Sequence, residues 1–184
     1  MSFLATLWLP LVVSAVVVFV VSAATHMLVP YRVREWSAAP DQAALQRAFA
    51  QSTPGLYVFP APATPSERGQ PEWLAAWAKG PSGWLALVPP GPLSMGRNLG
   101  LSLGVNLFVS LMAAYLADLT LGPAPATMPI LRLVSSVGVL AYGVGPAYEA
   151  IWYWRPWRTV VMGLVDALVY GLVMAAIFAW LWPR

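Results

Sequence analysis

The sequence predicts an all-α membrane protein, with four transmembrane helices and a small mixed α/β loop module between the first two. Two observations predict this class. The chain of 184 residues is 59% hydrophobic and only 9% charged, which leaves too few polar side chains for a water-soluble surface. It also contains four apolar stretches that are each long enough to cross a hydrocarbon core of about 30 Å, which requires roughly 20 helical residues.

We expect the helices at residues 3–29, 98–121, 128–154 and 157–182. The chain then divides into a first transmembrane helix (1–29), a loop module (30–97) and a three-helix transmembrane unit (98–184). The first stretch contains Val21-Ser22-Ala23-Ala24, which resembles the cleavage site of a secretory signal. No positive charge precedes this stretch, however, and its apolar run exceeds the core of a signal peptide, so we expect it to remain as a span.

The loop module shows weaker local patterns. A helix of about three turns is predicted from Pro40-Asp41 onward, since proline and an acidic residue suit a first helical turn. Two short apolar runs bounded by glycine and proline, residues 56–59 and 84–88, are predicted to pair as a β ribbon. Between them, Trp73 and Trp77 lie four residues apart, and we expect this segment to form a short helix on the membrane surface.

Small residues recur every four positions in two of the spans, and such spacing lets helix backbones approach closely in lipid. The residues are Gly100 and Gly104 in the second span, and Gly163, Ala167, Gly171 and Ala175 in the last. We expect contacts within the bundle at both stripes, with contacts to a second protein as the alternative. In the third span, Gly143-Val144-Gly145-Pro146 predicts a kink or an interruption.

The basic residues flanking the spans predict orientation, because positively charged flanks stay on the cytoplasmic side. Six fall on the side of the long loop and two on the other side: Arg32, Arg34, Lys79, Arg97, Arg155 and Arg158, against Arg132 and Arg184. Aromatic residues such as Tyr31 occur near the predicted interfaces, where rings with a polar edge are favoured. The loop module is therefore predicted to be cytoplasmic, and both termini extracytoplasmic.

Composition also argues against several classes of function. The chain has no cysteine, which excludes disulfides, thiolate-held metal clusters and covalently attached c-type haem. A net charge of +3, without a basic patch, argues against nucleic acid as a partner. We find no phosphate loop, paired-histidine zinc motif or nucleophile elbow, and therefore predict no catalytic residue and no metal site.

Ionisable residues within or at the ends of the spans are the remaining candidates for a site, because such groups are costly in lipid. Asp118 and Arg132 are predicted to form a structural ion pair at the outer face. His26, Glu149 and Asp166 are predicted to converge beneath the inner interface, since each lies within a few helical turns of it. For this buried polar cluster, a structural and a functional role both stay open.

Short motifs near the loop side resemble those of a family of uncharacterised four-span bacterial inner-membrane proteins with no known activity. The motifs are His26-Met27-Leu28-Val29-Pro30, Gly91-Pro92 with Met95-Gly96, and Arg155-Pro156-Trp157. The resemblance implies the four-span topology and a location in the bacterial inner membrane, and it transfers no site residues.

Three functions are compatible with these patterns, and the lipid bilayer is a partner in all of them. The first is a non-catalytic accessory or assembly subunit of a larger bacterial membrane complex, including an energy-converting one, associated with other subunits or with itself. The second is a small oligomeric transporter or channel. The third is a cofactor-holding or enzymatic membrane protein, in which His26 serves as an axial ligand to a haem or chlorin.

Overall fold

A computed structural model describes residues 3–30 and 36–183. Tyr31, Arg32, Arg34 and Arg184, which enter the orientation argument, lie outside the described residues. The chain separates into two compact units, a helical bundle and a loop module at Ser37–Leu93, and each is described by itself.

Within the described residues, four helices are long and apolar enough to cross a membrane, as predicted. They are α1 (Phe3–Leu28), α5 (Met95–Leu121), a third span at Thr127–Tyr153, and α8 (Trp157–Leu181). The third span consists of α6 (Thr127–Gly143) and α7 (Gly145–Tyr153). The predicted interruption therefore falls at Val144. Pro146, in the first turn of α7, has no N–H group to donate to the carbonyl of Tyr142, four residues earlier.

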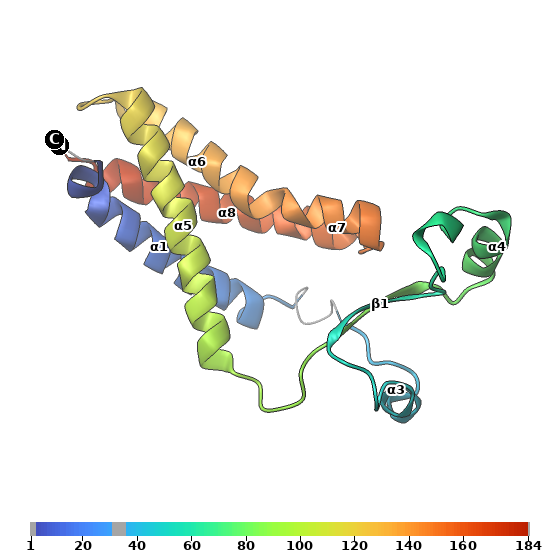
Figure 1. The fold of residues 1–184 in the computed structure, drawn as a ribbon. Helices are drawn as coiled ribbons and strands as arrows, with labels where there is room; N and C mark the ends of the chain where they lie inside the picture. The colour runs from blue at the N-terminus through green and yellow to red at the C-terminus, as the bar shows by residue number, and fades with distance from the viewer. Residues whose placement is uncertain (1–2, 31–35, 184) are drawn as a thin grey trace. The chain divides into compact units, whose positions relative to one another are not determined.

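The helix α8 lies at the centre of the bundle and packs against α6, α1 and α7, whereas α5 packs against α1 and α6. Figure 1 shows α6 and α8 running side by side. The largest fully buried side chains include Leu7 of α1, Ile130 of α6 and Phe178 of α8. These side chains form an apolar core in the half of the bundle where α1 begins and α8 ends.

Glycines bring α6 and α8 into close contact. A Cβ atom on Gly138 would lie 2.6 Å from the Cα of Gly171, and one on Gly171 would lie 2.8 Å from the carbonyl oxygen of Ser135. Ala167 and Ala175 of α8 are completely buried. The α8 stripe therefore serves packing within the bundle, as expected.

The stripe on α5 differs from this expectation. A Cβ atom on Gly100 or on Gly104 would meet no atom within 4 Å, and both glycines are exposed. The predicted contact within the bundle is absent here because α5 turns this face away from its described neighbours.

The loop module is built on an antiparallel two-stranded ribbon, which confirms the predicted pairing. Strands β1 (Gly55–Phe59) and β2 (Gly83–Leu87) pair with Tyr57 opposite Leu85. The helix α3 (Gln42–Ala48) begins after its N-cap Asp41, which accepts a hydrogen bond from the Ala44 amide, and it is shorter than the three turns expected because it ends at the C-cap Phe49. A short 3₁₀ turn at Pro65–Glu67 precedes α4 (Pro71–Lys79).

The tryptophans of α4 form part of the interior of this module. Trp73 and Trp77 are partly buried, with ring centroids 5.2 Å apart, and Trp77 also contacts Trp84 of β2 at 6.1 Å. The Trp73 indole donates a hydrogen bond to the Pro60 carbonyl. The predicted short helix is therefore confirmed, and its indoles pack against the ribbon; its place on a membrane surface stays a prediction.

Candidate functional site

A polar pocket of about 200 Å³ lies at the end of the bundle where α1 ends, α5 begins and α7 joins α8. We call this the loop end, and the opposite end, where α1 begins and α8 ends, the terminal end. The pocket, named the Asp166 pocket, is lined by His26, Tyr142, Pro146, Arg155, Thr159, Gly163, Asp166 and Tyr170. Its lining therefore combines residues from α1, α6, α7, α8 and the turn between α7 and α8.

Asp166 is the one buried carboxylate among the described residues, with 5% of its surface exposed. It lies on α8 between two small residues of the stripe, Gly163 and Ala167, which places it on the face that α8 turns toward the bundle. A carboxylate in an apolar bundle is costly unless polar groups or water surround it. The Asp166 pocket provides such surroundings through imidazole, guanidinium and hydroxyl groups.

His26 lines the same pocket from the last turn of α1. Its Nδ1 atom lies 2.8 Å from the carbonyl oxygen of Ser22. Because a carbonyl oxygen only accepts hydrogen bonds, Nδ1 carries the hydrogen, and the neutral ring keeps its lone pair on Nε2. Nε2 is therefore the atom of His26 at which a proton or another ligand can bind.

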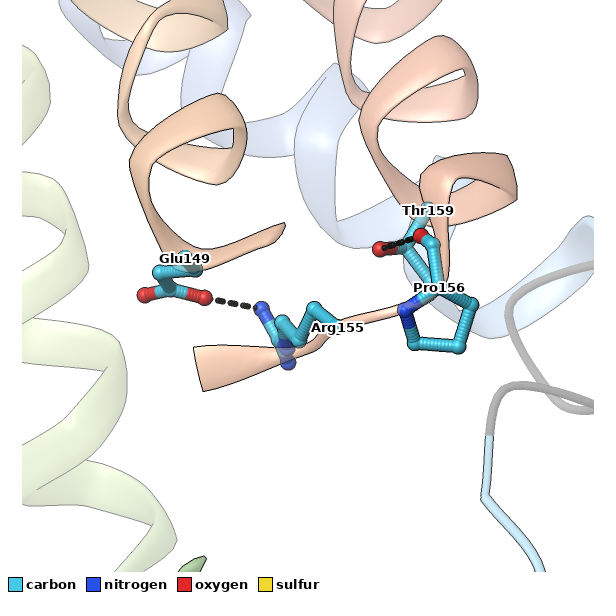
Figure 2. A network of polar contacts seen from close by, with 4 residues as sticks. All are labelled: Glu149, Arg155, Pro156 and Thr159. Carbon is cyan, nitrogen blue, oxygen red and sulfur yellow. Dashed lines mark hydrogen bonds and ion pairs between the residues drawn. The ribbon is translucent and has the colours of Figure 1, made fainter. Parts of the chain in front are cut away.

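Glu149 does not line the Asp166 pocket and instead forms an ion pair with Arg155 at 2.5 Å, as Figure 2 shows. The side chains of Arg155 and Glu149 are 39% and 51% exposed. Of the three residues predicted to converge, the structure thus places His26 and Asp166 around one pocket. Glu149 is linked to that pocket only through Arg155.

Sequence reasoning did not single out the residues that extend the site. Tyr142 and Tyr170 pack edge to face, with ring centroids 5.6 Å apart. The Tyr142 hydroxyl donates a hydrogen bond of 2.7 Å to Oδ1 of Asn106, whose amide nitrogen in turn donates to the Ser102 carbonyl. Both tyrosines also line a second pocket of about 220 Å³, next to Ser22, Ser102 and Asn106.

Two signals in the sequence point to these residues. Asn106 is an amide in the interior of an apolar span, where an unsatisfied polar group is costly and a partner is required. Tyr170 follows Asp166 by four residues, so both lie on the same face of α8. No comparable signal marks Tyr142, whose role depends on the position of α5.

At the terminal end, no ion pair joins Asp118 and Arg132 within the part of the chain that the structure describes. Both side chains are exposed. Asp118 borders a pocket of about 360 Å³ with Thr6 and Trp182. Each charge lies close enough to its helix end to interact with water or lipid headgroups, so neither requires the other as a partner.

The size of the Asp166 pocket limits what it can hold. A volume of about 200 Å³ accommodates several water molecules. Pockets for drug-sized ligands and cofactors typically measure about 300–1,000 Å³. A ligand held wholly within this pocket is therefore small, such as water molecules or a small cation.

Comparisons of the chain with protein-family models, with curated proteins and with solved structures found no match.

Proposed function

We propose that this chain is a small membrane transport protein that takes up protons at the Asp166 pocket. The observation that carries the proposal is a carboxylate buried inside a four-span bundle, in a pocket that the exposed imidazole of His26 lines from the end of α1. Intramembrane carboxylates and histidines are typical of proton relays in pumps and transporters. A proton also fits the small volume of the pocket.

The chemistry of the lining supports transfer as well as binding. His26 offers a lone pair at Nε2 and Asp166 offers carboxylate oxygens, so each group can accept a proton and release it again. The Tyr142 hydroxyl donates to Asn106, which leaves its oxygen lone pairs to accept from water in the pocket. These groups extend from the loop end toward the interior of the bundle.

An apolar core separates this pocket from the terminal end. Leu7, Ile130, Met174 and Phe178 are buried there and offer no titratable group. Release at the opposite side therefore requires a conformational change. The junction of α6 and α7 at Val144 lies beside the pocket and is a suitable hinge, since Pro146 removes a backbone hydrogen bond there while Val144 keeps helical dihedral angles.

Proton flux in proteoliposomes tests the proposal. Purified protein is reconstituted with an entrapped pH-sensitive dye, and a potassium gradient with valinomycin provides the driving force. Flux should exceed that of empty liposomes and should disappear in Asp166→Asn, which keeps the size and hydrogen-bonding capacity of the side chain. Absent wild-type flux, or equal flux in a folded Asp166→Asn protein, would contradict the proposal.

A role as an accessory subunit of a larger membrane complex is the second candidate. The α8 stripe no longer supports it, because α6 and α8 use those residues to pack against each other. The supporting observation is the open face of α5 at Gly100 and Gly104, beside the exposed Phe108. Extraction from native membranes in a mild detergent, followed by mass spectrometry, should then recover stoichiometric foreign subunits that Gly100→Leu displaces.

We also propose that the protein lies in the bacterial inner membrane, with the loop module in the cytoplasm and both termini outside it. The excess of basic residues at the loop end, including Arg97, Arg155 and Arg158, supports this orientation. Alkaline phosphatase fused after Arg184 should be active, and a fluorescent protein inserted near Ser66 should fluoresce. The reverse pattern would overturn the orientation and leave the four spans intact.

A further inference from the structure

Another hollow, separate from the three pockets described above, lies at the turn between α7 and α8. Its volume is about 520 Å³, and it is lined by Ala150, Ile151, Trp154, Arg155, Pro156 and Trp157. Trp154 and Trp157 are each 61% exposed. The hollow therefore combines two accessible indole rings with one guanidinium group.

The backbone of this turn is held in an uncommon conformation. Trp154 has a φ angle of 57°, in the left-handed region that bulky residues rarely adopt, and its N–H group bonds to the Glu149 carbonyl. Arg155 follows immediately, and α8 begins at Trp157. The turn thus directs the Arg155 side chain toward Glu149 of α7, as Figure 2 shows.

The length of the spans places this turn at the level of the lipid headgroups. The third span has 27 residues and is therefore about 40 Å long, whereas the hydrocarbon core measures about 30 Å. Tryptophan rings are favoured at this interface, and arginine in a pocket between transmembrane helices binds anionic headgroups. Arginine also matches the geometry of phosphate better than other cations do.

We propose that the hollow at the α7–α8 turn binds the phosphate of an anionic glycerophospholipid. Arg155 supplies the positive charge, and the indole rings of Trp154 and Trp157 contact the glycerol and upper acyl region. This site goes beyond the proposed transport function, and its occupancy can be measured without any flux.

The ion pair of Figure 2 determines how strongly the lipid is held. Glu149 bonds to one terminal nitrogen of the Arg155 guanidinium and carries the same sign of charge as a phosphate, so the carboxylate and the lipid compete for Arg155. Arg155 also lines the Asp166 pocket. A bound lipid that draws Arg155 away from Glu149 would therefore change the charge next to Asp166, which couples the lipid to the pocket.

Native mass spectrometry of the purified full-length protein tests this site. Dioleoylphosphatidylglycerol and dioleoylphosphatidylcholine, which share acyl chains and differ in headgroup charge, are titrated in parallel. One arginine near a membrane surface contributes about 1 kcal/mol toward anionic lipid, which corresponds to about a fivefold difference in affinity. We expect phosphatidylglycerol to bind about fivefold more tightly than phosphatidylcholine.

Two variants separate lipid binding from a purely structural role of the ion pair. Arg155→Gln should abolish the preference for phosphatidylglycerol, whereas Glu149→Gln should increase it several-fold, although both variants break the same ion pair. Arg132→Gln, which changes an exposed arginine at the terminal end, should leave the preference unchanged. Thermal unfolding of each variant verifies that it is folded.

Three results would overturn the proposal. The first is equal binding of the two lipids by the wild-type protein. The second is a change of the preference for phosphatidylglycerol in the same direction in Arg155→Gln and Glu149→Gln. The third is displacement of phosphatidylglycerol by an equal concentration of inorganic phosphate. The last result would indicate a site for a free anion rather than for a lipid.

Discussion

The helices α8 and α5 carry similar sequence features and occupy different environments. Each has glycines spaced by four residues, and each has an aspartate inside or near the end of its span. In α8, Gly171 contacts the backbone of α6 and Asp166 is 5% exposed. In α5, Gly100 meets no neighbour, and Asp118 is exposed.

The difference shows that spacing alone does not report burial in a membrane protein. Lipid is as apolar as the interior of the bundle, so hydropathy cannot distinguish a packed face from a lipid-facing one. What separates the two helices is how closely these faces pack, since Gly171 of α8 meets the backbone of α6, whereas the Gly100 face of α5 meets no described neighbour. Matched substitutions on the two helices test this distinction.

The largest effect is expected for leucine substitutions at the two glycines. Gly171→Leu forces a side chain against the Ser135 carbonyl, only 2.8 Å from the position of a Cβ atom, and should prevent assembly of the α6–α8 pair. Gly100→Leu should leave the isolated protein folded, because its face is open. Expression and thermal unfolding of fluorescent fusions measure both variants, and an equal loss in the two would remove the distinction.

Alanine substitutions at the same two positions should change the stability of the fold in different ways. Gly171→Ala should destabilise the fold by about 1–3 kcal/mol, because its new methyl group also meets the packed α6 backbone. Gly100→Ala should be neutral, or stabilising by up to about 1 kcal/mol, since alanine has the higher helix propensity. Unfolding titrations in mixed micelles report both values, and stabilisation by Gly171→Ala would contradict the packing described for α8.

A smaller effect is expected where α5 does contact the bundle. Tyr142→Phe and Asn106→Leu each remove the 2.7 Å hydrogen bond between α6 and α5. A double-mutant cycle should give a coupling of about 0.6 kcal/mol, within the range measured between transmembrane helices. A coupling of zero would mean that this bond does not position Tyr142.

The smallest effect is expected for Asp118→Asn, on α5. An exposed side chain without an ion pair in the described residues should change stability by less than about 0.5 kcal/mol. Proton flux should also stay at the wild-type level. Loss of flux in this variant would show that Asp118 at the terminal end takes part in transport.

Much of the fold follows from local sequence. Apolar length predicts the four spans, and Gly143 to Pro146 predicts the break in the third one, because both depend on residues close in the chain. The ribbon is likewise predicted from two short apolar runs.

The candidate site was predicted only in part, since it depends on which helices become neighbours. Depth along the helices predicts that His26 and Asp166 lie at similar levels, and the structure places both around one pocket. The position of a residue along its helix does not predict that Glu149 turns toward Arg155, or that Tyr142 reaches Asn106 on another helix. The spacing of Trp73 and Trp77 predicts their helix but not that both indoles pack within the loop module, which depends on where the ribbon lies.

Asp166 is proposed to be a membrane-buried carboxyl group that exchanges protons, and chemical labelling can detect such a group. Dicyclohexylcarbodiimide enters the hydrocarbon region and reacts with protonated carboxyl groups, and peptide mass spectrometry identifies each modified residue. We expect the adduct to form on Asp166 well before Asp118 in the same molecules, and proton flux to fall in proportion. Labelling of both aspartates at the same rate, or an unmodified Asp166, would contradict this proposal.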